Sequence, residues 1–220
     1  MSSNAALVED LAASGHVRTE AVRQALLSVD RALFLPGHEG EAYEDRPVAI
    51  GGGQTISAPH MVAIMAEALE LAPGHRVLEV GGGSGYHAAV LARLVAPEGR
   101  VVAVEILPEL AARARQNLAR AGLASSVEVL AGDGSLGAPD RAPFDRVSVA
   151  CAAPSIPPPL LGQLREGGLA VVPVGTRHEQ TLVRARKGPG GRIGIEDLGG
   201  CVFVPLRGAF GFPDGPDRLG

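Results

Sequence analysis

Two carboxylates and a run of glycines stand at a spacing that suits the binding of a charged nucleoside. Glu79 comes just before the sequence GGGSG, residues 81–85, and Glu105 closes the next apolar run, VVAVE. A glycine turn lets a ligand approach the backbone and aims the free N–H groups of the following helix at it. Glu79 can meet an ammonium group and would repel a pyrophosphate, whereas Glu105 can accept ribose hydroxyls. The alternative is a glycine-rich turn with two solvated acids.

The glycine pattern also separates two kinds of cofactor site. A dinucleotide fingerprint reads G-x-G-x-x-G, and here Tyr86 stands where the third glycine should be. The pattern E-x-G-x-G-x-G, which begins at Glu79, instead resembles the first motif of the class I, Rossmann-like methyltransferases that use S-adenosylmethionine. By this resemblance, the cofactor-binding residues are Glu79, Gly81, Gly82, Gly83, Ser84, Gly85, Glu105 and Ile106.

A polar stretch from Tyr43 to Met61, YEDRPVAIGGGQTISAPHM, is a candidate functional loop. It is too polar for a core and too specific in composition for a linker. Pro59 suits the first turn of the helix that follows, which places Ser57 just ahead of that helix. The residue pattern leaves two interpretations open: Ser57 either caps the helix or takes part in the chemistry.

Eight segments together resemble the protein-L-isoaspartate O-methyltransferase family: YEDRP, GGGQTIS, SAPHM, VLEVGGGSGYHAAVLA, VVAVEI, AGDG, PFDRVSV and VVPVG. The likeness spans roughly residues 31–175 in register, and QTIS-x-P is characteristic of this family. It implies that Ser57 is the catalytic serine. The implied cofactor-binding residues then also include Gln54, Thr55, Ile56, Ser57, Gly132, Asp133 and Gly134. The implied substrate-binding residues are Ser57, His60, Ala152, Ala153, Pro173, Val174, Val204 and Leu206.

The resemblance implies an enzyme that uses S-adenosyl-L-methionine, releases S-adenosyl-L-homocysteine and needs no metal. It would methylate the free α-carboxylate of L-isoaspartyl residues in age-damaged proteins and peptides, which then repair through a succinimide. A carboxylate with a pKa near 3.9 is already ionised at neutral pH, so no general base is required. His60 is then a half-buried polar neighbour rather than an acid or base.

Two departures from the family pattern keep other functions open. The usual arginine before F-V-P-L is Val202, and the usual threonine after it is Arg207. One alternative is a methyltransferase that acts on a carboxylate of a dedicated peptide precursor. Another is a non-catalytic module that binds S-adenosylmethionine, against which the intact QTIS segment argues.

Periodicity predicts the elements that position these residues: an α/β, Rossmann-like, doubly wound and mostly parallel sheet of about seven strands, with helices on both faces. We expect one methyltransferase domain over residues 1–210, in which a helical and loop segment, 1–60, covers the site. Residues 211–220 are expected to form a disordered tail. Strands are predicted at 77–80, 101–105, 127–130, 144–149, 169–172, 181–186 and 202–206. Helices are predicted within 5–30, after Pro59, at 88–94, at 108–121, and from Pro157 through Leu164 to an end at Gly167–Gly168.

Composition and charge limit the kinds of binding partner that we expect. The 220 residues carry a formal net charge of -4 without a lysine or arginine block, so electrostatic capture of nucleic acid or of a membrane is not expected. The acidic N-terminus and the absence of a long apolar run predict a cytoplasmic protein, and we expect a monomer. The two cysteines, Cys151 and Cys201, are too few for a disulfide framework and are predicted to be buried thiols. The histidines are dispersed, without metal-ligand spacing.

Overall fold

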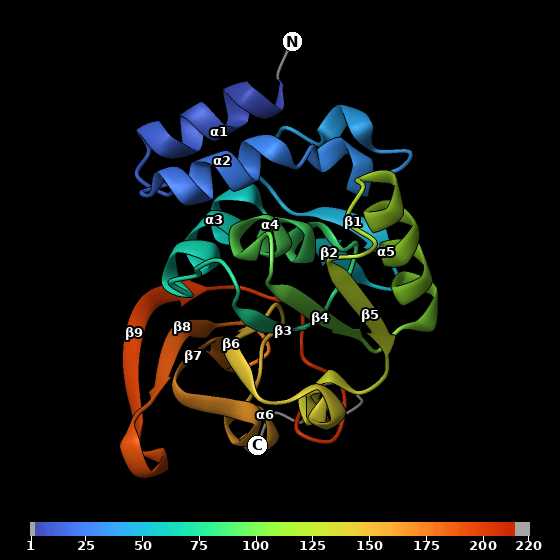
Figure 1. Cartoon of the computed structure of the whole chain (residues 1–220). Helices are drawn as coiled ribbons and strands as arrows, with labels where there is room; N and C mark the ends of the chain where they lie inside the picture. Colours follow the sequence, from blue (N-terminus) through green and yellow to red (C-terminus); the bar gives the residue numbers. More distant parts are fainter. Residues whose placement is uncertain (1–2, 214–220) are drawn as a thin grey trace.

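A seven-stranded sheet forms the centre of the molecule in the computed structural model, which describes residues 3–213 (Figure 1). Its strand order is β5-β4-β3-β6-β7-β8-β9. The strands are β3 (Arg76–Val80), β4 (Arg100–Glu105), β5 (Val127–Ala131), β6 (Phe144–Val149), β7 (Leu164–Gly175), β8 (Gln180–Lys187) and β9 (Ile193–Cys201). The pairings from β5 to β7 are parallel, and β8 and β9 are antiparallel to their neighbours. The predicted mostly parallel sheet is confirmed.

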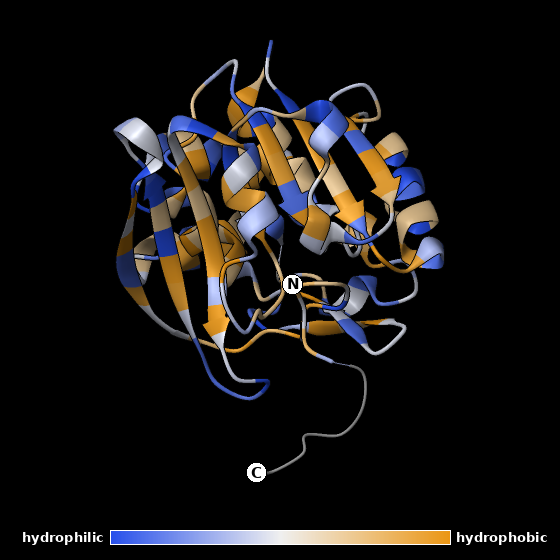
Figure 2. Cartoon of the chain, turned by 90° about the horizontal axis from the view of Figure 1, so that it is seen from below, coloured by the Kyte–Doolittle hydropathy of each residue, from blue (hydrophilic) through white to orange (hydrophobic). Residues whose placement is uncertain are grey.

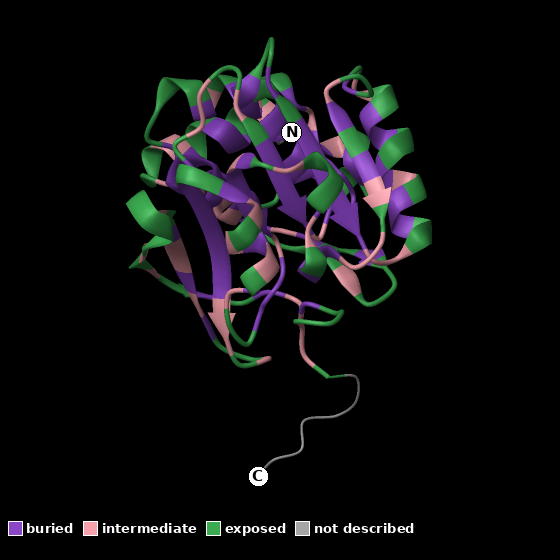
Figure 3. Cartoon of the chain, turned by 60° about the horizontal axis from the view of Figure 1, so that its bottom comes forward, coloured by how far each residue is buried: buried purple, intermediate pink, exposed green. Residues whose placement is uncertain are grey.

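Helices cover both faces of this sheet. One face carries α1 (Asn4–Ala13), α2 (Glu20–Ser28), α3 (Pro59–Ala68), α4 (Tyr86–Val95) and α5 (Pro108–Arg120), and the other carries α6 (Pro158–Gln163) (Figure 1). Side chains alternate across β3, so Val77 packs into the core under α4 while Leu78 packs into the core with α6. The central strands are buried and apolar on both sides, as Figures 2 and 3 show.

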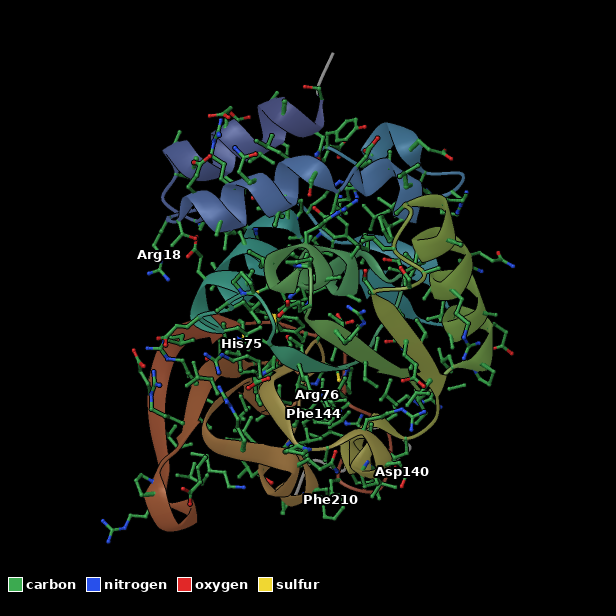
Figure 4. The ribbon with its side chains drawn as sticks, in the orientation of Figure 1. Arg18, His75, Arg76, Asp140, Phe144 and Phe210 are labelled. Carbon is green, nitrogen blue, oxygen red and sulfur yellow. The ribbon has the colours of Figure 1, made fainter. Side chains whose placement is uncertain are left out.

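The amino ends of the strands lie away from the glycine turn. Arg76 and Phe144 begin β3 and β6 and lie near one another in Figure 4. The backbone N–H of Arg76 donates to the Asp145 carboxylate at 2.6 Å, which ties the two strands at this end. The site predicted from the sequence lies at the opposite, carboxyl end, where parallel strands of open sheets bind ligands.

The stretch predicted as a loop between residues 43 and 61 contains a β-hairpin that the sequence analysis missed. Its strands are β1 (Val48–Gly51) and β2 (Gln54–Ile56), which pair antiparallel. Gly51, Gly52 and Gly53 all have positive φ, a conformation that glycine adopts readily, so the turn favours glycine at these positions. The hairpin holds Gln54, Thr55 and Ile56 in extended backbone.

Two predictions about the carboxyl half were wrong. Gly167 and Gly168 do not end a helix, because α6 stops at Gln163 and β7 already begins at Leu164. Residues 202–206 are not the last strand of the sheet, which is β9. They run past Ala152 instead, where the Leu206 N–H donates to the Ala152 carbonyl at 2.7 Å.

The predictions for the two ends of the chain had different outcomes. The helices predicted within residues 5–30 are confirmed as α1 and α2, which pack on α3 and α4. Of the tail predicted from Gly211 onward, residues 211–213 pack against the preceding chain, since the Phe212 N–H donates to the Leu206 carbonyl at 2.9 Å. Residues 214–220 of that prediction lie outside the described residues.

Candidate active site

The carboxyl ends of β3, β4 and β6 open into a cleft of about 510 Å³. The hairpin and the segment after β9 close its sides. Its lining includes the predicted residues Gln54, Thr55, Gly81, Gly83, Glu105, Ile106, Gly134, Val204 and Leu206. A smaller adjoining cavity shares Thr55, Gly81 and Gly83 with the cleft and adds the predicted Ile56, Ser57, Glu79, Gly82 and Ser84. The fold thus gathers most of the predicted residues into one continuous space.

The glycine turn owes its shape to backbone conformations that other residues rarely adopt. Gly81, Gly83 and Gly85 have φ values of 85°, 51° and 87°. A Cβ atom on Gly81 would lie 3.4 Å from the Cys151 sulfur, so the backbone stays close to the floor of the cleft. Gly85 does not line the cleft. It is the N-terminal cap of α4.

Glu105 is fixed by the backbone around it. One carboxylate oxygen, Oε2, accepts from the Gly83 N–H at 2.8 Å, and Oε1 accepts from the Leu107 N–H at 2.9 Å. The residue is only 5% exposed, yet it lines the cleft. Because a carboxylate can accept about four hydrogen bonds, the oxygens keep capacity for hydroxyl donors from a ligand.

Glu79 is fully buried, and neither oxygen of its carboxylate has a hydrogen-bond partner within residues 3–213. Nδ1 of His87 on α4 lies 3.3 Å from Oε1. Ser148, which faces Glu79 across β3 and β6, also has a buried hydroxyl without a partner. Burial raises the pKa of Glu79, and His87 opposes this shift. A buried carboxylate left without donors is costly, so this position favours a cationic ligand.

Ser57 does not cap α3, so one of the two interpretations that the sequence left open is excluded. The cap residue is Ala58, and the His60 N–H in the first turn is accepted by the Asp45 carboxylate at 2.9 Å. Ser57 is half-buried and lines the smaller cavity, and its hydroxyl makes no hydrogen bond to any residue in 3–213. The capping interpretation was wrong, and the hydroxyl is available to a ligand.

Several predicted residues lie outside the cleft lining. The His60 ring contacts Asp45, with Nδ1 2.9 Å from the carboxylate, and lies beside His16. Asp133 accepts from the Ser135 N–H and hydroxyl and from the Ala209 N–H, so its carboxylate already holds the C-terminal segment. Gly132 is likewise absent from the lining residues.

The small residues at 152 and 153 pack against other segments of this protein. Both are fully buried, and their backbone groups bond to residues 173, 175, 204 and 206. The backbone that passes close to them in the structure is this protein's own. Pro173 is buried in β7, and Val174 is half-buried beside Ala153.

Some lining residues were not among the predicted site residues. The cleft also contains Cys151, a buried thiol whose pKa is raised by burial, and the exposed Arg207. The smaller cavity also contains Tyr86 and His87. Cys151 follows the end of a strand, and that position indicates this edge of the sheet. Nothing in the local sequence pattern indicates that His87 lines the site. Cys201 is a buried thiol as well, so the prediction for both cysteines is confirmed.

Residues 3–213 contain no group of three or more histidine, cysteine, aspartate or glutamate side chains arranged to hold a metal ion. No helix in the same part of the chain has the length and apolar character needed to cross a membrane.

Comparison with known proteins agrees with this geometry. The family model for protein-L-isoaspartate(D-aspartate) O-methyltransferase matches residues 2–210. Proteins named protein-L-isoaspartate O-methyltransferase from Methanopyrus kandleri and Hyperthermus butylicus are 53% and 51% identical to this chain over 94% of its length, and the matches cover 92% and 89% of those proteins. A crystal structure of a Plasmodium falciparum protein described by the same name, in complex with S-adenosyl-L-homocysteine, superposes with a TM-score of 0.84 at 26% identity, over 94% of this chain and 99% of that one. This chain belongs to the protein-L-isoaspartate O-methyltransferase family.

Proposed function

We propose that this enzyme transfers a methyl group from S-adenosyl-L-methionine to the free α-carboxylate of L-isoaspartyl residues in proteins and peptides, and so initiates their repair. Relatives of that name, about half identical over nearly the whole chain, support the activity. The observation that carries the residue assignment is the position of Ser57. Ser57 lines the same cavity as the glycine turn and Glu79, and its hydroxyl makes no hydrogen bond within residues 3–213.

The residues of the cleft fit this cofactor. When bound, S-adenosyl-L-methionine supplies the methyl group on a sulfonium centre. The buried Glu79 carboxylate, which has no hydrogen-bond partner within residues 3–213, would accept from the ammonium group. Glu105, held by two backbone N–H groups, accepts from the ribose hydroxyls. The glycine turn allows the close approach that both contacts need.

The chain then has to orient an acceptor that is already reactive. A carboxylate of this type has a pKa near 3.9, so Ser57 donates a hydrogen bond that aligns the carboxylate and removes no proton. Well-oriented proximity can lower such a barrier by about 7 to 11 kcal/mol. His60 is therefore not required as a base.

A pair of matched peptides tests the function. A peptide with one isoaspartyl residue should accept a methyl group, whereas the twin with an ordinary aspartyl residue at the same position should not. Initial rates with isotopically labelled cofactor measure the preference. Equal labelling of both would favour an enzyme for a dedicated peptide precursor. Cofactor binding without labelling of either peptide would indicate a non-catalytic module.

Arg207 should influence which peptides bind. Its exposed side chain lines the cleft, where a positive charge attracts acidic residues next to the isoaspartyl position. Exposed charge pairs contribute about 0.2 to 1 kcal/mol, so Arg207→Thr should raise KM for peptides with acidic neighbours up to about fivefold at low salt. A peptide with neutral neighbours is the control. An equal change for both peptides, or none at all, would remove Arg207 from substrate selection.

A further inference from the structure

Arg31 is an arginine that the fold buries completely. It begins the short 3-10 helix η1 (Arg31–Phe34), and its exposed fraction is 0%. Arg31 forms no salt bridge with any carboxylate in residues 3–213, although buried charged side chains are normally paired. Burial accordingly lowers the pKa of its guanidinium. The hydrogen bonds of the buried guanidinium indicate what this charge does in the structure.

The guanidinium donates to three backbone carbonyls on the polar stretch that leads to the site. Nη1 donates to the Ala42 carbonyl at 2.8 Å, and Nη2 donates to the carbonyls of Arg46 at 3.2 Å and Ser57 at 3.1 Å. These carbonyls lie on either side of the hairpin and beside YEDRP. Arg31 therefore fixes the entry to this stretch and the backbone of Ser57 with one rigid group.

The same side chain also reaches the cofactor side of the site. Its Cζ atom lies 5.8 Å from the ring centre of Tyr86, a buried residue that opens α4 directly after the glycine turn. Phe34 also packs against Tyr86 in an edge-to-face arrangement, with the ring centres 5.6 Å apart. Arg31 thus bridges the segment of Ser57 and the start of the helix that follows the glycines.

We infer that Arg31 is a positioning residue for methyl transfer: it holds the Ser57 backbone in register with the glycine turn, so that acceptor and donor meet in line. This role rests on the proposed function of Ser57. Arginine suits it because its planar fork presents several donors in fixed directions, whereas lysine presents one ammonium on a flexible stem. Misplacement by about 1 Å can cost on the order of a hundredfold in rate, so a small shift of Ser57 is expected to matter.

Arg146 provides a matched control within the same chain. It is also buried, at 8% exposure, and its guanidinium donates to the carbonyls of Leu69, Glu70 and Asp145. Burial lowers its pKa as well. It lies at the amino end of β6, away from the cleft. Loss of this guanidinium removes a comparable set of bonds without touching the segment of Ser57.

The test compares Arg31→Met, Arg31→Lys and Arg146→Met with the parent enzyme. Melting temperature, affinity for S-adenosyl-L-homocysteine and the single-turnover rate on an isoaspartyl peptide are measured well below the lowest melting temperature. We expect both methionine variants to melt lower. Arg31→Met should also lose tenfold or more in rate with affinity for the product within about threefold, whereas Arg146→Met keeps the parent rate.

Arg31→Lys carries the test if the methionine variant does not fold. It retains the charge but cannot span three carbonyls, so we expect about a tenfold lower rate with little change in product affinity. Parent rates in the Arg31 variants that fold would make Arg31 a structural residue only and overturn the inference. A parent enzyme that is inactive on the isoaspartyl peptide would instead overturn the proposed function, and the role of Arg31 with it.

Discussion

Replacing Ser57 with alanine should lower the single-turnover rate of methyl transfer by tenfold or more and leave the fold and cofactor affinity nearly unchanged. The expected stability is close to that of the parent because Ala58, not Ser57, caps α3, and because Asp45 accepts the His60 N–H. The loss in rate follows from removal of the hydrogen bond that aligns the acceptor carboxylate. Thermal unfolding and single-turnover rates on one preparation measure both effects.

A true cap supplies the control for Ser57. Thr19 caps α2, where its side-chain oxygen accepts from the Val22 N–H at 3.3 Å. Thr19→Ala should therefore lose about 0.5 to 2 kcal/mol of stability and keep the parent rate of methyl transfer. A Ser57→Ala protein that behaves in the same way, destabilised but fully active, would remove Ser57 from the reaction.

The second large effect concerns Glu79 and depends on which part of the ligand is present. Glu79→Gln should weaken binding of S-adenosyl-L-homocysteine about ten- to a hundredfold, because a hydrogen bond to a charged group contributes about 1.5 to 3 kcal/mol. It should leave 5′-methylthioadenosine, which lacks the ammonium, nearly unaffected. Calorimetry with both ligands measures this difference.

Glu105→Ala is the matched control, since its carboxylate is placed for the ribose that both ligands share. This variant should weaken both ligands to a similar extent. Equal weakening of both ligands by Glu79→Gln would show that Glu79 supports the turn rather than meeting an ammonium group.

Glu79 should also leave a pH signature in the unliganded protein. Its pKa is raised by burial, so the folded state binds the proton more tightly than the unfolded state does. Stability from this group is therefore fully present below the unfolded pKa of about 4.3 and is lost as pH rises through the raised folded pKa. Relative to Glu79→Gln, the parent should lose stability across that window, and denaturant titrations at several pH values measure the difference.

The sequence predicted the parts of the site whose residues follow buried strands. Glu79 and Glu105 could be placed because apolar runs mark β3 and β4, and carboxyl ends of parallel strands meet at one edge. The β1–β2 hairpin was missed because its short strands lie within a glycine-rich polar stretch. The last strand, β9, was missed because most of its residues are exposed, which leaves no apolar alternation to detect.

Local sequence patterns could not predict contacts between segments that are distant in the chain. Arg31 looks like any surface arginine in the sequence, and its partners are backbone carbonyls whose positions depend on the complete fold. Ser57 illustrates the same limit, because a proline two residues later favours a cap at this position. Only the position of Asp45 shows that the first turn of α3 is already satisfied.

The most direct test of the account follows the fate of a pure isoaspartyl peptide incubated with the enzyme and S-adenosyl-L-methionine. Methylation of its α-carboxylate creates an ester that closes to a succinimide, which partly reopens to normal aspartate. Chromatography over time should show the isoaspartyl peptide decline and its aspartyl twin accumulate, with one methyl group consumed per turnover and no change when the cofactor is omitted. An isoaspartyl peptide that persists unchanged, or an aspartyl twin that is methylated equally fast, would contradict the central claim.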